Sequence, residues 1–220
     1  MDIVTICGLK KYFGAGRRLV KALDGIELSV EKGRLTAVIG SSGSGKTTLL
    51  GIIGGLYEPT EGSVIVGGVH LSTLSEEQLT VFRRRKVGFL FQECRLIPEL
   101  TVEENILFPL ALDDSFPDRA FFAGLTDFLE LSVRLDWYPR MLSGGQQKRV
   151  AIARALITKP ALILADEPTG SLDLKNGRNI AGLLRRTTDV FHQTLVMVTH
   201  SRELAQMADR VVRLRDGRLI

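Results

Sequence analysis

The glycine-rich stretch GSSGSGKTT, residues 40–48, constrains the fold of this chain more than any other part of the sequence. It matches the pattern G-x-x-x-x-G-K-[ST], in which a glycine-rich turn joins a buried strand to the first turn of a helix. The flanking residues suit that geometry, because the apolar run 35–39 precedes the turn and a segment with an apolar face, 47–56, follows it. The sequence therefore predicts a strand, a phosphate-cradling loop and a helix, in that order.

This loop is the predicted binding site for a nucleotide. We expect its backbone N–H groups to surround the phosphate oxygens, because the first turn of a helix presents unpaired donors and a positive dipole end. Lys46 is expected to reach the β- and γ-phosphates, and the hydroxyl of Thr47 is expected to bind Mg²⁺. The predicted phosphate-binding residues are Gly40, Ser41, Ser42, Gly43, Ser44, Gly45, Lys46, Thr47 and Thr48.

Four short apolar runs predict a mostly parallel sheet. They lie at residues 36–40, 87–91, 161–165 and 194–199. None of them alternates with polar residues, so each is expected to be buried on both faces, as in a parallel sheet covered by helices. Helical patterns lie around and between these runs, at 45–56, 147–157, 177–188 and 202–209. This order is typical of an α/β fold.

The N-terminal and middle parts of the chain depart from this order. Short strands with little helix between them, at 3–9, 22–30 and 62–68, predict a small antiparallel sheet beside the parallel one. Four prolines punctuate the helical stretches between 92 and 141, which we interpret as an inserted helical lobe. We therefore expect one domain over 1–220, with a nucleotide-binding core from 1–91 and 142–220 and a lobe from 92–141.

The composition indicates a domain that needs neither disulfides nor zinc. Cys7 and Cys94 are the only cysteines, and they are too far apart in sequence to form a metal framework or a redox pair. The N-terminus does not resemble a signal peptide, and no apolar run approaches the roughly 20 residues that span a bilayer. We expect a soluble chain. A net charge of +4 is a weak signal for nucleic acid, and the RRRK cluster at 83–86 is interpreted as a solvated helix end.

Two acidic residues follow the apolar run at 161–165. Asp166 stands where an enzyme of this loop type needs a carboxylate for Mg²⁺, and Glu167 is placed to orient and deprotonate the attacking water. An acidic helix cap is the alternative. Because both carboxylates follow a buried strand and precede a proline, we favour catalysis.

A histidine follows the last of the apolar runs. Parallel strands end at one edge of a sheet, so His200 is expected to lie near the two carboxylates and to contact the γ-phosphate. The other two histidines, His70 and His192, are interpreted as structural.

A second glycine-rich turn opens the stretch LSGGQQKRVAIARAL, residues 142–156. Adjacent glycines let the backbone approach a ligand, a serine hydroxyl can donate to it, and the helix that follows supplies its N-terminal N–H groups. The predicted anion-binding residues are Ser143, Gly144, Gly145 and Gln146. A chain with one nucleotide loop has no evident need for a second such turn.

With this turn included, the motifs resemble those of the ATP-binding cassette (ABC) ATPases, in family order and over essentially the whole chain. In that family two cassettes pack head to tail, and each ATP lies between the P-loop of one and the LSGGQ turn of the other. The resemblance thus implies ATP and Mg²⁺ as ligands and a second cassette as partner. It also explains the second turn, which serves the nucleotide bound by the other chain.

Further residues match the family's motifs one by one. Tyr12 matches the aromatic residue that stacks on adenine; its neighbour Phe13 leaves the register open, and a core aromatic residue is the alternative. Gln92 matches the Q-loop glutamine, which contacts Mg²⁺ and the attacking water. Asp173 matches the D-loop that touches the opposite subunit, and His200 matches the switch histidine.

Three stretches, residues 82–113, 142–173 and 193–219, carry a narrower resemblance. They resemble the MacB/LolD/FtsE group, and within it the bacitracin-type exporters of antimicrobial peptides. This resemblance implies a separate multi-span permease of the FtsX or MacB type and a peripheral position on the cytoplasmic face of the membrane. The export of antimicrobial peptides, lipoproteins or macrolides would follow. Cys94 and Arg95 depart from the group's usual aromatic residue and asparagine on the permease side of the Q-loop, which puts the partner's identity in doubt.

Two other functions remain open. A cell-division adaptor like FtsE binds a permease-like partner and transports nothing, and only the partner's identity separates it from a transporter. A nucleic-acid-associated ABC ATPase is disfavoured, because such proteins carry coiled-coil insertions, zinc cysteines or two fused cassettes, which do not fit in this chain. We expect no nucleic-acid partner.

Overall fold

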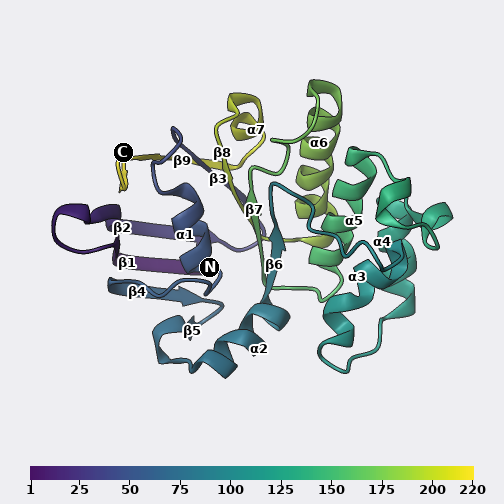
Figure 1. Cartoon of the computed structure of the whole chain (residues 1–220), viewed down its shortest axis with the longest axis horizontal. Coiled ribbons are helices and arrows are strands. Elements are labelled where there is room, and N and C mark those ends of the chain that lie inside the picture. The colour runs from purple at the N-terminus through teal and green to yellow at the C-terminus, as the bar shows by residue number, and fades with distance from the viewer.

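This computed structural model describes residues 1–220, except for the side chain of Arg17. The strands of the described chain form two sheets. Figure 1 shows the smaller sheet on one side of the larger sheet and most of the helices on the other side. Helix α1, Lys46–Ile53, contacts strands of both sheets. The predicted α/β fold with a flanking antiparallel sheet and a helical lobe is confirmed.

The larger sheet has the strand order β10-β9-β3-β8-β7-β6 within the described residues. Its strands are β3 (Leu35–Ile39), β6 (Val87–Leu90), β7 (Leu162–Asp166), β8 (Leu195–Thr199), β9 (Arg210–Arg215) and β10 (Arg218–Leu219). All neighbours are parallel except β10, which pairs antiparallel with β9. The predicted strands are confirmed as β3, β6, β7 and β8. β9 and β10 were not predicted, because arginines interrupt the apolar run of β9 and the edge strand β10 has only two residues.

The central strands are apolar on both faces because each face is covered. Side chains alternate between the faces of a strand. In β7, Ile163 and Ala165 pack among the helices, whereas Leu162 and Leu164 pack against α1 and the smaller sheet. All four are fully buried. Two core layers, one on each side of the sheet, thus explain the continuous apolar runs.

The smaller sheet has the order β2-β1-β4-β5 and is antiparallel throughout the described residues. Its strands are β1 (Asp2–Phe13), β2 (Val20–Glu31), β4 (Glu61–Val66) and β5 (Val69–His70), with short 3-10 turns at Gly16–Arg18 and Leu71–Thr73. The three strands predicted for this region are confirmed as β1, β2 and β4. β5 is an additional short edge strand.

The segment 92–141, for which a helical lobe was predicted, consists of helices joined by loops, and its bounds as a lobe stay a prediction. It contains α3 (Val102–Ala111), α4 (Arg119–Phe128) and 3-10 turns at Ser132–Arg134 and Pro139–Met141. Asn105, fully buried in α3, accepts a hydrogen bond from Ile97 N at 2.8 Å and donates to the carbonyl oxygens of Ile97 and Leu100 at 3.0 Å each. This amide ties the segment after the Q-loop to the lobe. Within the described residues, no helix is both long enough and apolar enough to span a bilayer.

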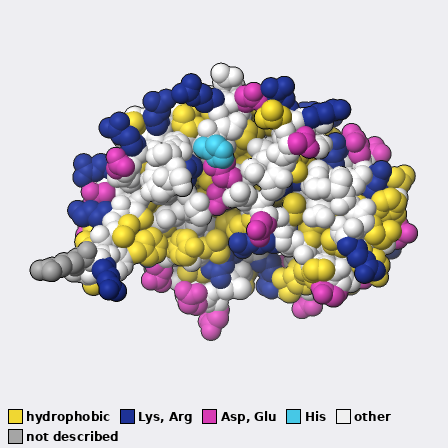
Figure 2. All heavy atoms as spheres, turned by 45° about the horizontal axis from the view of Figure 1, so that its top comes forward, with side chains coloured by type: hydrophobic (Ala, Val, Ile, Leu, Met, Phe, Trp, Pro, Cys, Tyr) yellow, Lys and Arg dark blue, Asp and Glu magenta, His cyan; other side chains and the backbone are white. Residues whose placement is uncertain are grey.

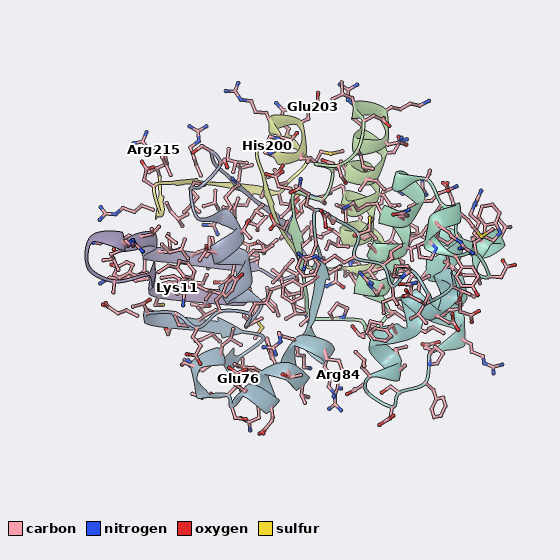
Figure 3. The ribbon with its side chains drawn as sticks, viewed as in Figure 1. Lys11, Glu76, Arg84, His200, Glu203 and Arg215 are labelled. Carbon is pink, nitrogen blue, oxygen red and sulfur yellow. The ribbon has the colours of Figure 1, made fainter. Side chains whose placement is uncertain are left out.

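The remaining helices are α2 (Glu76–Lys86), α5 (Gly144–Leu156), α6 (Leu174–Phe191) and α7 (Arg202–Gln206). The basic cluster forms the last turn of α2, as predicted, and Arg85 and Lys86 are exposed, but three of its arginines also bind other parts of the chain. Arg84 and Arg85 of α2 each lie 2.7 Å from a carboxylate oxygen of Asp113, just beyond α3. Arg83 donates to Gly55 O at 2.7 Å. The cluster therefore links α2 to the helical lobe, and Figure 3 shows Arg84 on the side of α2 that faces the lobe.

Candidate active site

The glycine-rich loop joins β3 to α1, and two of its glycines are required by close backbone contacts. Gly45 precedes α1 with a φ of 103°, in the left-handed region, and a Cβ atom there would lie 2.3 Å from Ala22 O. A Cβ atom on Gly40 would lie 2.3 Å from Leu214 O. Larger residues at either position would push the loop away from β2 or β9.

The polar groups of the loop suit a phosphate ligand. The side chain of Lys46 is nearly buried, and its Nζ donates to the carbonyl oxygens of Gly40 and Ser41 at 2.9 Å each. Ser44 Oγ is buried without a hydrogen-bond partner in the part of the chain that the structure describes. Because a buried hydroxyl is costly to leave unpaired, both groups fit an anion seated in the loop.

A cavity of about 960 Å³ opens beside this loop. Its walls include Ser42, Gly43, Gly45, Lys46, Thr47, Thr48, Gln92, Asp166, Glu167 and His200. The cavity thus brings together residues predicted separately from the loop, the Q-loop and the ends of β7 and β8. Figure 2 shows acidic side chains gathered beside a histidine on this face of the molecule.

The groups suited to Mg²⁺ meet at the end of β7. Thr47 Oγ1 donates to Asp166 Oδ1 at 3.3 Å, and the side chain of Gln92 lines the same cavity. Burial raises the pKa of Asp166, and the hydrogen bond from Thr47 opposes that effect. A magnesium ion at this position would offset the cost of burying the carboxylate and would neutralise charge on the phosphates. The oxygen donors present therefore fit the ion.

Glu167 is held by the end of β8. Its Oε1 lies 2.8 Å from His200 Nδ1, and its Oε2 accepts from Thr199 Oγ1 at 3.0 Å. Its φ of 42° lies in the left-handed region, which is uncommon for a residue other than glycine, and its N–H donates to Val198 O at 3.0 Å. His200 is largely exposed and lines the cavity, and Figure 3 shows it beside α7. Both oxygens of the carboxylate are thereby held by residues at the end of β8.

The Q-loop backbone meets two other elements at Gln92. The carbonyl oxygen of Gln92 accepts from Lys148 Nζ at 2.8 Å and from Ser171 Oγ at 3.3 Å, and Lys148 Nζ also donates to Phe91 O at 3.0 Å. Lys148 lies in α5 and is fully buried, and burial lowers its pKa. Sequence reasoning missed this lysine, because a lysine in an amphipathic helix is usually a surface residue.

The second glycine-rich turn forms the N-terminus of α5. Ser143 Oγ accepts from Gln146 N at 3.4 Å, and Gln146 Oε1 accepts from Ser143 N at 2.9 Å. This capping box fixes the turn. Among the residues that the structure describes, none of 143–146 lines the cavity beside the P-loop. Ser143 and Gly144 are exposed instead.

Asp173 caps the N-terminus of α6, where it accepts from Asn176 N at 2.9 Å. This backbone hydrogen bond holds the pKa of Asp173 below its usual value. A Cβ atom on Gly145 would lie 3.5 Å from Asn176 Oδ1, so the D-loop and the second turn are adjacent. The two motifs that the resemblance assigns to contact with another cassette thus share one surface.

The structure does not bring Tyr12 to the wall of the cavity. Its hydroxyl donates to Asp24 Oδ1 at 2.6 Å, and Lys21 Nζ lies 5.3 Å from the centre of its ring. The ring of Tyr12 therefore forms a cation–π contact with Lys21, and Lys21 does line the cavity. Phe13 is exposed and packs edge-on against Tyr57. Stacking of Tyr12 or Phe13 on adenine stays a prediction.

Five further residues line the cavity: Val20, Lys21, Ala22, Asp216 and Gly217. They come from the start of β2 and from the turn between β9 and β10. No local pattern in the sequence could have identified them, because the fold brings these distant segments to the P-loop. Val20 is mostly exposed and offers an apolar surface at the rim.

A mostly parallel sheet in which the P-loop follows β3 and two carboxylates follow β7 at the same edge defines a nucleoside triphosphate hydrolase of the P-loop class. The family model described as ABC transporter matches residues 23–170, more than half of the chain. The chain therefore belongs to the ABC transporter family, and its site is that of an ABC-type ATP hydrolase.

Named relatives support the narrower group. The chain is 42% identical over 220 residues to the macrolide export ATP-binding/permease protein MacB 1 of Aeromonas hydrophila, an alignment covering 99% of this chain and 34% of that protein. It is 41% identical over 219 residues to the lipoprotein-releasing system ATP-binding protein LolD of Colwellia psychrerythraea, covering 99% and 85%. The expected membership of the MacB/LolD/FtsE group is confirmed. The chain spans about a third of the MacB relative's length.

A solved structure supports the fold and the nucleotide. The dimeric post-hydrolysis state of the cassette MJ0796, bound to ADP and Pi, matches with a TM-score of 0.86 and 38% identity, covering 98% of this chain and 96% of that one. The expected ATP ligand agrees with that relative's bound products.

Proposed function

We propose that this chain is an ABC transporter cassette that hydrolyses ATP between two copies packed head to tail. The observation that carries the proposal is the separation of the two anion-binding turns. The P-loop, Asp166, Glu167 and His200 share one cavity, whereas the turn 143–146 lies exposed outside it, among the residues that the structure describes. Two half-sites of this kind complete each other only across an interface between chains.

In this proposal each residue has a distinct role. Lys46 and the loop N–H groups bind the phosphates, and Thr47, Asp166 and Gln92 hold Mg²⁺. Glu167 accepts a proton from the attacking water, and its two contacts with the end of β8 orient the carboxylate. His200, beside Glu167, contacts the γ-phosphate. The residues contributed by the second chain are Ser143, Gly144, Gly145, Gln146 and Asp173, and Tyr12 stacks on adenine.

A groove supports a membrane permease as the second partner. It has a volume of about 410 Å³ and lies between the core and the helical lobe. Its lining combines apolar residues, including Phe89, Phe108 and Leu112, with Arg84, Arg95 and Arg154. An amphipathic permease segment with an apolar face and an acidic residue fits this surface. We name it the Arg95 groove.

The relatives suggest what the permease does. Their printed names include macrolide export and lipoprotein release, and the sequence resembles bacitracin-type peptide exporters. We propose an FtsX-type or MacB-type permease that acts on peptides, lipoproteins or macrolides, with the cassette on the cytoplasmic face of the membrane. An FtsE-like adaptor that transports nothing would bind its partner through the same groove.

Oligomeric state tests the composite site. Glu167→Gln is expected to bind ATP without hydrolysing it, so the variant should elute as a dimer in gel filtration with ATP and Mg²⁺. The wild type should elute as a monomer with ADP. A Glu167→Gln variant that is loaded with ATP and remains monomeric contradicts the head-to-tail proposal.

Reconstitution tests the permease proposal. The chain should co-purify with a multi-span FtsX-type permease, and the complex in lipid should hydrolyse ATP faster than the cassette alone. Arg95→Glu should remove the stimulation while the cassette alone still hydrolyses ATP. Lys32→Glu, an exposed charge reversal outside the groove, is the control.

Deletion of the gene should sensitise cells to cell-wall-active peptides, and unchanged sensitivity rejects that substrate class. Recovery of the chain with DNA or ribosomes instead of membranes rejects transport.

A further inference from the structure

A buried lysine connects α5, the helix that begins at the LSGGQ turn, to the Q-loop. Lys148 of α5 has no exposed surface, and no carboxylate pairs with it in the described part of the chain. Its Nζ donates only to backbone carbonyls, those of Phe91 and Gln92, at 3.0 and 2.8 Å. An unpaired buried ammonium is costly, and an apolar side chain of similar length would fill the space at lower cost. Packing alone therefore does not account for this lysine.

The same helix holds the Q-loop at a second point. Arg154 donates to the carbonyl oxygens of Cys94 and Arg95 at 2.8 Å each. Four of the five carbonyls from Phe91 to Arg95 thus accept from α5. Gln92 O also accepts from Ser171 Oγ in the D-loop. The Q-loop backbone is therefore fixed relative to the two segments that face another cassette.

We propose that Lys148 is a positioning residue, which couples the position of the Gln92 side chain in the ATP cavity to the position of the turn 143–146. Ser143 and Lys148 belong to one helix and are separated by about 7.5 Å along its axis, so a displacement at the turn moves the ammonium with it. The ammonium is hydrogen-bonded to the backbone carbonyl of Gln92, and the Gln92 side chain lines the cavity. A displacement of the ammonium is therefore expected to move the Gln92 side chain. The inference rests on the proposed contact of Gln92 with Mg²⁺ and water.

The first test separates turnover from binding. Lys148→Met keeps most of the length and packing of the side chain and removes both hydrogen bonds. In the purified full-length chain, kcat should fall roughly 10- to 100-fold, as expected for slight misplacement of a catalytic group, while the Kd for ATP changes less than about twofold. Lys148→Arg should restore part of the turnover.

The adjacent residue provides a matched control. Arg149 of α5 donates to Leu129 O at 3.1 Å, which lies inside the helical lobe. Arg149→Met also removes a cation bonded to a carbonyl, together with its 3.1 Å ion pair with Glu130, but it leaves the Q-loop untouched. Its kcat should stay close to that of the wild type. An equal loss of kcat in both variants would indicate a general effect on the helix and would overturn the proposal.

A double-mutant cycle supplies a readout that a structural role would not move. If Lys148 acts through Gln92, Lys148→Met should reduce kcat no further in a Gln92→Ala background. The same fold-loss in both backgrounds rejects the proposal while leaving the role of Gln92 intact. Full activity of Gln92→Ala rejects both. Should Lys148→Met fail to fold, Lys148→Gln, which can still donate to one carbonyl, takes its place in the same cycle.

Discussion

Replacing Glu167 by Gln is expected to remove the general base and little else. The glutamine oxygen can accept from Thr199 Oγ1, as Glu167 Oε2 does at 3.0 Å. Its amide nitrogen can donate to His200 Nδ1, in place of the 2.8 Å contact, if the imidazole proton moves to Nε2. Shape and contacts are retained, so the melting temperature should stay within a few degrees of the wild type.

The size of the effect follows from the lost proton acceptor. General-base assistance is worth roughly 10²- to 10⁴-fold, which corresponds to about 3–5.5 kcal/mol in the activation barrier. Single-turnover hydrolysis of radiolabelled ATP measures the chemical step, and a fluorescent ATP analogue measures affinity, which should not change. Glu203→Gln, a substitution in α7 that alters an exposed pair with Arg178, is the control. Hydrolysis by Glu167→Gln within about threefold of the wild type would refute the role of Glu167.

Two further predictions concern stability. Asp24 has its pKa lowered from 3.8 to about 2, first by the hydrogen bond from Tyr12 and then by that from Arg218, so its stabilising contribution is complete above pH 3.8 and is lost as the pH falls through about 2. Melting curves of Asp24→Asn and the wild type should therefore differ at neutral pH and converge towards pH 2; a constant difference contradicts this. Gly88→Ala should destabilise the fold by about 1–3 kcal/mol in urea unfolding, because its Cβ would lie 2.4 Å from Ala155 O. Gly124→Ala in α4, where a Cβ meets nothing within 4 Å, should be neutral or stabilising.

The catalytic half of the site could be predicted because each part of it is local in sequence. The P-loop has a fixed spacing, and Asp166, Glu167 and His200 follow continuous apolar strands. Parallel strands end at one edge of a sheet, so their following residues meet there. The structure brings these side chains together in the expected cavity.

The remaining features depend on contacts between distant segments. Lys148 and Arg84 look like surface residues of amphipathic helices, and only the tertiary structure places them against the Q-loop and Asp113. The arginine-rich strand β9 joins the parallel sheet because its backbone pairs with β3, which side-chain hydropathy does not reveal. Lys21 and Asp216 reach the cavity from two different turns. Local periodicity contains no information about such pairings.

Mixing two inactive variants tests the composite site most directly. Lys46→Ala removes the side chain that binds the phosphates of its own chain's nucleotide. Ser143→Arg blocks the turn that contacts the nucleotide of the other chain. Ser143→Arg alone should bind ATP with near-normal affinity as a monomer, and neither variant alone should hydrolyse it. Mixed in equal amounts with ATP and Mg²⁺, they should recover measurable hydrolysis, because each mixed dimer contains one intact P-loop opposite one intact turn. A mixture no more active than the two separate variants, or a large loss of monomer affinity in Ser143→Arg, would contradict the composite site.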